Sequence, residues 1–460
     1  MNLKSLRLYL LIILEYLKRK KWLIIGGILG IIVIVAIQLK FNLLNSEEVL
    51  RVGLIGTYQE HDLPEELTKL ISAPLVEASS DGRIKPKLVK GWEVNNDATQ
   101  FKFKLKDDIK WSDNSPVKST DLEFGIPNVS VSYPDDKTIQ FNLKESYSPL
   151  PSLLTKPTFK KGTLFGVGPY RVAKVEKSRI FITKIILQPD NPELPQVHIR
   201  FYPSEKVALT GFNLGEVQLL LGFSNPKLIN ANPLIDIKQT IDYSKIVTIF
   251  FQTEDPLLKN RSLRQALSYQ TSEVGGEQVA NNPYPPNYWV YDAFAKKYLS
   301  NPEEAQAALE RAKSQLSDDQ LHSEIVLTAI PNLEEVGKAV VESWKKLGFD
   351  AKLRVESGIP QNFQALLITQ SIPIDPDQYF LWHATQAKTN LTKYNSKRVD
   401  KDLEDGRKII TEDERKAKYF DFQKILLEDA PAAFLYFPKY NIVSLKKVEP
   451  VLNKVLNLLR

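Results

Sequence analysis

Hydrophobic and polar residues alternate strictly along one stretch of the chain, in which Phe101, Phe103 and Leu105 are separated by lysines. A period of two places alternate side chains on opposite faces of a strand, so one face is buried and the other meets water. Shorter alternating or apolar runs predict further strands over residues 49–55, 139–143, 170–175, 180–187, 197–201 and 247–251. This part of the chain therefore predicts a mixed sheet with few long helices.

A helical period replaces this alternation in the second half of the chain. Asn301 and Pro302 are typical of the start of a helix, and alanine and leucine then recur at spacings of three or four residues. Val336, Val340 and Trp344 mark a second apolar helical face. Short apolar runs at 325–328, 351–355 and 363–368 predict strands between the helices, so we expect an α/β lobe here.

Two pairs of residues have the spacing of a capping box, in which two side chains satisfy backbone N–H groups at a helix start. Thr120 and Glu123 predict a short helix that Pro127 ends, and Thr411 and Glu414 predict the last long helix. A late strand is expected over residues 434–440.

An uncharged apolar segment from Trp22 to Leu39 follows the basic cluster Lys18–Lys21. As a helix, this segment spans about 27 Å, which is close to the thickness of a bilayer core. The positive-inside rule then places the basic cluster in the cytoplasm and the C-terminal domain outside. The competing interpretation is a cleaved signal peptide, but no small-residue cleavage site ends the segment, so we expect an uncleaved anchor.

The net charge of +6 arises at the amino terminus. Seven of the 61 basic residues but one of the 55 acidic residues lie within residues 1–40, so the remainder is formally neutral. A general nucleic-acid-binding surface therefore has no compositional support. The chain also has no cysteine, which excludes disulfides and thiolate metal sites.

Catalytic motifs are missing as well. The four histidines are far apart, and neither HExxH, GxSxG nor a phosphate-binding lysine motif occurs. Adjacent carboxylates such as Asp107 and Asp108 are better explained as turn residues. We therefore expect no enzyme activity, no cofactor and no metal site.

Several ordered motifs resemble the family 5 extracellular solute-binding proteins, the oligopeptide-, dipeptide- and nickel-binding components of ATP-binding cassette importers. They lie at Gly82–Leu88, Lys110–Pro116, Gly166–Val172 and Asn260–Ser268. The resemblance implies an α/β, two-lobed periplasmic-binding-protein-like fold (type II) with an extra small β-rich subdomain. It also implies a structural role for Arg264.

The implied domain organisation starts from the membrane segment. We expect a cytoplasmic basic segment over residues 1–21 and a transmembrane anchor over residues 22–39. The first lobe should consist of residues 49–75, 165–250 and 435–460. The small β-rich subdomain should consist of residues 76–164, and the second lobe of residues 251–434. The two lobes should close on a ligand by hinge motion.

The stretch from Ser371 to His383 is the richest candidate for ligand contact. It resembles the family region that borders the ligand cleft, and its carboxylates, aromatic rings and amides suit a small-ligand site. The residues expected to bind ligand are Asp375, Asp377, Tyr379, Trp382, His383 and Asn390. Ile372 stands where peptide-binding members have the aspartate that pairs with the ligand's ammonium group, so an ordinary peptide terminus lacks its usual partner.

A proline-aromatic loop, Pro283–Trp289, has two interpretations. It could form a stacking wall of a pocket, or a rigid connector, which the fixed proline dihedrals favour.

The resemblance implies that the protein binds a peptide or other small solute and works with the permease and ATPase subunits of an importer. One alternative is a membrane-tethered ligand sensor or adaptor without transport. A second is a peptide- or glycan-acting hydrolase, which would need two carboxylates that converge in a cleft.

Overall fold

The computed structural model describes residues 48–224, 229, 232–272, 274–276, 278–299 and 301–458. The expected membrane anchor, residues 22–39, and the basic segment before it lie outside these residues. Within the described ranges, no helix combines the length and apolar character needed to cross a bilayer.

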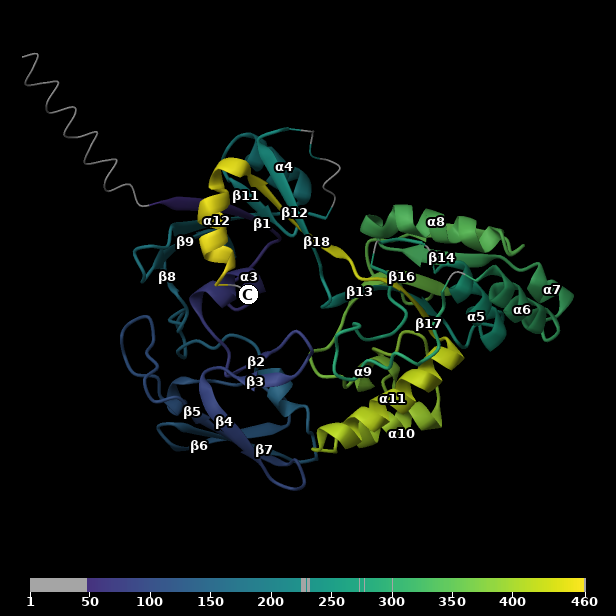
Figure 1. Cartoon of the computed structure of the whole chain (residues 1–460), viewed down its shortest axis with the longest axis horizontal. Helices are drawn as coiled ribbons and strands as arrows, with labels where there is room; N and C mark the ends of the chain where they lie inside the picture. The colour runs from purple at the N-terminus through teal and green to yellow at the C-terminus, as the bar shows by residue number, and fades with distance from the viewer. Residues whose placement is uncertain are drawn as a thin grey trace, which may run out of the picture.

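The first lobe is built on a seven-stranded sheet with the order β12-β18-β11-β1-β10-β9-β8. Its central strand β1 (Val49–Ile55) pairs in parallel with β10 (Gln196–Tyr202) and β11 (Leu219–Leu221). The remaining strands are β8 (Tyr170–Ser178), β9 (Phe181–Pro189), β12 (Ile235–Ile241) and β18 (Lys439–Leu445). The helices α3 (Glu65–Ile71), α4 (Glu205–Asn213) and α12 (Glu449–Leu456) accompany this sheet (Figure 1).

The second lobe is built on a five-stranded sheet with the order β15-β14-β16-β13-β17. The strands are β13 (Lys245–Phe251), β14 (Ile325–Ala329), β15 (Ala351–Val355), β16 (Ala365–Ser371) and β17 (Ala432–Tyr436). Alternate residues of β13 enter two different cores, with Ile249 in one and Phe250 in the other. The sheet is therefore buried on both faces.

Different helices cover the two faces of this sheet. The core that contains Ile249 takes residues from α5 (Arg261–Gln270), α6 (Pro302–Lys313) and α8 (Glu334–Lys345). The core that contains Phe250 takes residues from α9 (Tyr379–Trp382), α10 (Lys397–Gly406) and α11 (Glu412–Asp429). The short helix α7 (Asp318–Leu321) precedes β14. Figure 1 shows α8 and the pair α10–α11 on opposite sides of the sheet.

The small subdomain is a four-stranded sheet with the order β4-β5-β7-β6, preceded by the hairpin β2 (Val76–Ala78) and β3 (Ile84–Pro86). Its strands are β4 (Val89–Val94), β5 (Gln100–Leu105), β6 (Val129–Asp135) and β7 (Thr138–Leu143). The alternation in β5 is confirmed, because Phe101, Phe103 and Leu105 are buried and the lysines between them are exposed.

Both predicted capping boxes are wrong. Residues Ser119–Asp121 form one 3-10 turn, in which the Asp121 carboxylate accepts from the Lys118 N–H and from the Trp111 indole. The helix α11 does begin after Thr411, but no side chain caps it. The spacing of a capping box can occur in a sequence without the hydrogen bonds of the box, because the tertiary contacts of each segment decide which backbone N–H groups need a partner.

The two lobes are joined by two short crossings, from β12 to β13 and from β17 to β18. The crossings contact each other, since Asp242 N donates to Pro438 O at 2.8 Å and the rings of Tyr243 and Phe437 lie 5.1 Å apart. The sequence predicts a first lobe that extends to residue 250 and resumes at residue 435. Because β13 and β17 both belong to the second sheet, we propose lobe boundaries at residues 242–244 and 437–438.

Arg264 has the structural role expected for it. Its guanidinium donates to the backbone carbonyls of Ala430, Leu258, Lys259 and Asp429, and so ties the start of α5 to the end of α11. Burial lowers its pKa to about 10, which still leaves the group charged at neutral pH.

Candidate functional site

A cavity of about 240 Å³ lies where the small subdomain meets the second lobe. One wall comes from the small subdomain and the other from the loop before α6, the loop before α9, and the start of α11. The lining residues from the small subdomain are Gly82, Arg83, Ile84, Trp92, Val94, Phe101, Ser148, Pro149, Pro151 and Ser152. Those from the second lobe are Trp289, Asp375, Ile410, Glu412 and Arg415.

Aromatic rings from both sides line this cavity. Trp92 on β4 stacks on Phe103 of β5 at 5.6 Å, and Phe101 lies in the core of the small sheet. Trp289 enters from the second lobe, and its backbone N–H donates to Asp81 O at 2.9 Å. These rings give the cavity apolar walls that are fixed by backbone pairing.

The proline-aromatic loop combines both interpretations that its sequence allowed. Tyr284 is fully buried and donates its hydroxyl to Pro376 O at 2.5 Å, while Tyr288 packs over Gly82. A Cβ on Gly82 would lie 1.8 Å from the Tyr288 ring, at a backbone φ of +81° that favours glycine. The loop is therefore a rigid connector that carries Trp289 to the cavity wall.

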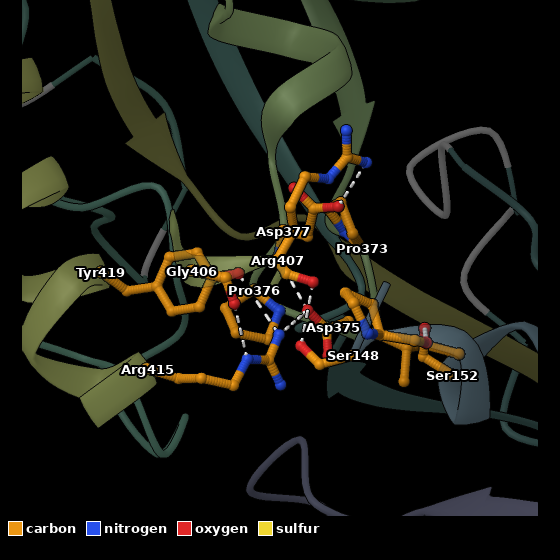
Figure 2. Close-up of polar contacts among 12 residues, drawn as sticks. Ser148, Ser152, Pro373, Asp375, Pro376, Asp377, Gly406, Arg407, Arg415 and Tyr419 are labelled. Atoms are coloured by element: carbon orange, nitrogen blue, oxygen red, sulfur yellow. Dashed lines mark hydrogen bonds and ion pairs between the residues drawn. The ribbon is translucent and has the colours of Figure 1, made fainter. Parts of the chain in front are cut away.

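A buried ion pair lies at one end of the cavity. Arg415 on α11 donates from Nη2 to Asp375 Oδ1 at 2.6 Å and from Nε to Gly406 O at 2.9 Å, as Figure 2 shows. The two side chains are 10% and 11% exposed. Burial alone would lower the pKa of Arg415, but the Asp375 carboxylate raises it above its ordinary value.

A second pair stabilises the same loop. Arg407 donates to Asp377 at 2.8 Å, and its guanidinium lies 4.1 Å from the ring centre of Tyr379. Burial raises the pKa of Asp377, while the Arg407 charge opposes that shift. The carbonyl of Arg407 also accepts from the Ser148 N–H at 2.8 Å, which joins the small subdomain to the second lobe (Figure 2).

An exposed ion pair closes the rim of the cavity. Arg83 of the small subdomain donates to both carboxylate oxygens of Glu412 at the start of α11, with a shortest distance of 2.6 Å. Both side chains are almost half exposed. Arg83 also pairs with Asp81. A Ser79 hydrogen bond, together with Arg83, lowers the pKa of Asp81 to about 2.

Of the six residues expected to touch ligand, only Asp375 lines the cavity. Trp382 is 0% exposed, and its indole donates to Gln378 inside the second-lobe core. Asn390 is buried and donates to Tyr394 O at 2.8 Å, which holds the chain turn in place. These two residues therefore make contacts within the second lobe, and a ligand role for them stays a prediction.

The other three expected residues are the buried Asp377 and His383 and the half-buried Tyr379. The rings of Tyr379 and His383 stack at 4.0 Å. His383 contacts Glu404 at 3.2 Å, and Asp377 is the partner of Arg407. None of the three lines the cavity.

Sequence reasoning missed most of the cavity residues. Arg415 and Glu412 lie on the last long helix, for which the sequence suggested no site, and Arg83 belongs to a motif that indicated the family without suggesting a site. The aromatic density around Trp92 was an available signal, because aromatic residues near turns often line small-ligand sites.

Metal binding has no support in the described part of the chain, where no group of three or more His, Asp or Glu residues is arranged to hold an ion. The site instead combines apolar walls with paired charges.

The chain is similar in sequence to a family of binding proteins and to individual members of it. The sequence profile of the bacterial extracellular solute-binding proteins, family 5 (middle region), matches residues 83–390. The probable D,D-dipeptide-binding periplasmic protein of Escherichia coli is 21% identical, and the match covers 84% of this chain and 87% of that protein.

Two solved structures have a similar fold. The first is a Campylobacter jejuni protein in complex with Ni(L-His), with 20% identity and a TM-score of 0.68, covering 87% of this chain and 94% of that one. The second is an oligopeptide-binding protein of Bacillus subtilis in complex with a nonapeptide, with 19% identity and a TM-score of 0.63, covering 87% of this chain and 95% of that one. Both likenesses concern the fold.

Mutation of the two ion pairs at the cavity should lower stability by very different amounts. Arg415→Met leaves the buried Asp375 carboxylate without a counterion and should lower the free energy of unfolding by about 3–5 kcal/mol. Arg83→Ala breaks an exposed pair and should cost at most about 1 kcal/mol. Chemical denaturation followed by tryptophan fluorescence measures both, and equal losses would contradict the assigned burial.

Asp402 on α10 predicts a pH dependence of stability. Its Oδ2 is buried without a hydrogen-bond partner, and Lys418 lies 3.7 Å from its other oxygen. Burial and the neighbouring Asp421 raise its pKa to about 6, against the opposing charges of Lys418 and Arg398.

The folded state therefore binds the Asp402 proton more tightly than the unfolded state, and stability should fall as the pH rises from about 4 to about 6. Asp402→Asn should gain stability relative to the parent over this interval, so the Tm of the variant minus the Tm of the parent should be larger at pH 7 than at pH 4. A Tm difference that is the same at both pH values would contradict the raised pKa of Asp402.

Proposed function

Because the chain belongs to the bacterial extracellular solute-binding proteins, family 5, we propose that it binds small peptides outside the cytoplasmic membrane for an ATP-binding cassette importer. The observation that carries the proposal is the extent of the family match, residues 83–390. It includes most of the small subdomain, most of the residues that line the cavity and most of the second sheet. The permease and ATPase subunits would be separate chains.

Peptide is the favoured ligand for two reasons. The Escherichia coli relative is described as a probable D,D-dipeptide-binding protein, and the Bacillus subtilis structure holds a nonapeptide. The cavity of this chain adds apolar rings beside hydrogen-bonding groups, which suit a peptide side chain and its backbone amides. Among the six residues expected to bind ligand, Asp375 has the best-supported role.

Hinge closure fits the connection between the lobes. The short crossings at residues 242–244 and 437–438 are the segments whose backbone angles would change as one lobe moves against the other. A ligand that contacts both sides in the closed state would shift the population toward that state.

The proposed membrane anchor is inferred from the sequence alone. We place the apolar segment 22–39 in the membrane, with the described residues on the extracytoplasmic side. A tethered binding protein would stay near its permease at high effective concentration.

A thermal-shift screen of the full chain in detergent tests the ligand proposal. Di- and tripeptides should raise the Tm in a concentration-dependent way, because a ligand that binds only the folded state stabilises it. Nickel complexes and oligosaccharides serve as comparison ligands. If peptide libraries give no shift while another class does, peptide is removed as the ligand.

Intact-mass measurement of the protein from its native membrane tests the anchor. Retention of residues 1–47 is expected, together with partition into the membrane fraction after a high-salt wash. A mature protein that lacks the first ~40 residues would identify a cleaved signal peptide instead.

A further inference from the structure

The charges that line the cavity cancel in pairs. Arg83 pairs with Glu412 and Arg415 pairs with Asp375, both at 2.6 Å. No other charged side chain lines the cavity in the described part of the chain, so the lining carries no net charge. A ligand group with a net charge would be desolvated here without a free counterion, which is unfavourable.

The buried pair nevertheless leaves hydrogen-bonding capacity open. Asp375 uses Oδ1 for both the Arg415 guanidinium and the Asp377 N–H, and Arg415 uses Nε and Nη2. No hydrogen bond to Asp375 Oδ2 or from Arg415 Nη1 is formed within the described residues, and neither atom is fully enclosed. An acceptor and a donor therefore remain accessible on two residues that line the cavity.

An amide group matches this arrangement. An amide N–H can donate to the carboxylate oxygen, and the C=O of the same amide, if cis or primary, or of a neighbouring amide can accept from the guanidinium. Neither contact requires a net charge on the ligand. The indole rings of Trp92 and Trp289 and the ring of Phe101 provide apolar walls on either side. The volume of about 240 Å³ lies just below the ~300 Å³ at which ligand pockets begin, so the occupant is small.

We propose that this cavity selects neutral, amide-bearing solutes, namely small peptides whose amino terminus is blocked or cyclised, over zwitterionic peptides. The inference rests on the proposed peptide-binding function and names the class of peptide. Asp375 and Arg415 are its specificity-determining residues, and at the rim Arg83 is held by both Glu412 and Asp81, which leaves no free cation there among the residues that line the cavity.

Isothermal titration of the full chain in detergent tests this selection with three forms of one dipeptide. The probes are zwitterionic Phe-Ala, its N-acetyl amide, and the cyclic dipeptide of the same residues. The neutral forms should bind at least ten-fold tighter than the zwitterion. Equal or tighter binding of the zwitterion overturns the proposal. If none of the three binds while library peptides do, this inference fails and peptide binding stands; if library peptides fail as well, the proposed function fails.

A charge-changing variant sharpens the test. Asp375→Asn removes the carboxylate charge and leaves Arg415 as an uncompensated cation. The affinity for the N-acetyl dipeptide with a free carboxylate should therefore rise about ten-fold relative to the affinity for its amide. Asp421→Asn is the matched control on α11, the helix of Arg415, where the Asp421 carboxylate pairs with Arg398 at the surface, and Asp421 does not line the cavity. This control should keep the parent's selectivity.

A rim variant covers the case in which Asp375→Asn does not fold. Glu412→Gln weakens the exposed partner of Arg83 and should shift selectivity in the same direction, toward the anionic peptide, by a smaller factor. If the ratio of the affinities for anionic and neutral peptides is unchanged in every folded variant, the proposed role of the paired charges is overturned.

Discussion

The architecture around the cavity depends on two guanidinium groups that neutralise two carboxylates of one loop. Arg415 and Arg407, at the facing ends of α11 and α10, bind Asp375 and Asp377. Breaking either pair would leave a charge in a low-dielectric surrounding, so the loop, the helix ends and the cavity wall hold one another in place. Tyr284 holds the same loop from the other side through Pro376 O.

This loop also connects the small subdomain with the second lobe. The carbonyl of Arg407, whose side chain binds Asp377, accepts from the Ser148 N–H. The ion pair between Arg83 and Glu412 lies at the rim of the same junction. A ligand in the cavity would thus contact two parts of the chain whose relative position the paired charges determine. That coupling between packing and recognition is the basis of the proposed selectivity for neutral peptides.

The sequence predicted most of the fold because its signals are local. Alternation in β5 and the Asn301 cap of α6 each depend on neighbouring residues, and both are confirmed. The site was predicted poorly because its geometry is nonlocal. Asp375 and Arg415 are 40 residues apart, and nothing near Arg415 indicates that a helix end turns it inward. Trp382 was expected to contact ligand, but its ring is buried in the core of the second lobe.

The proposed selectivity for neutral peptides can be checked by a crystal structure of the protein with a bound N-acetyl dipeptide amide. We expect ligand density between Trp92 and Trp289, with an amide N–H on Asp375 Oδ2 and an amide carbonyl on the Arg415 guanidinium. Ligand density elsewhere in the molecule, with this cavity filled only by water, would overturn the proposed role of the cavity.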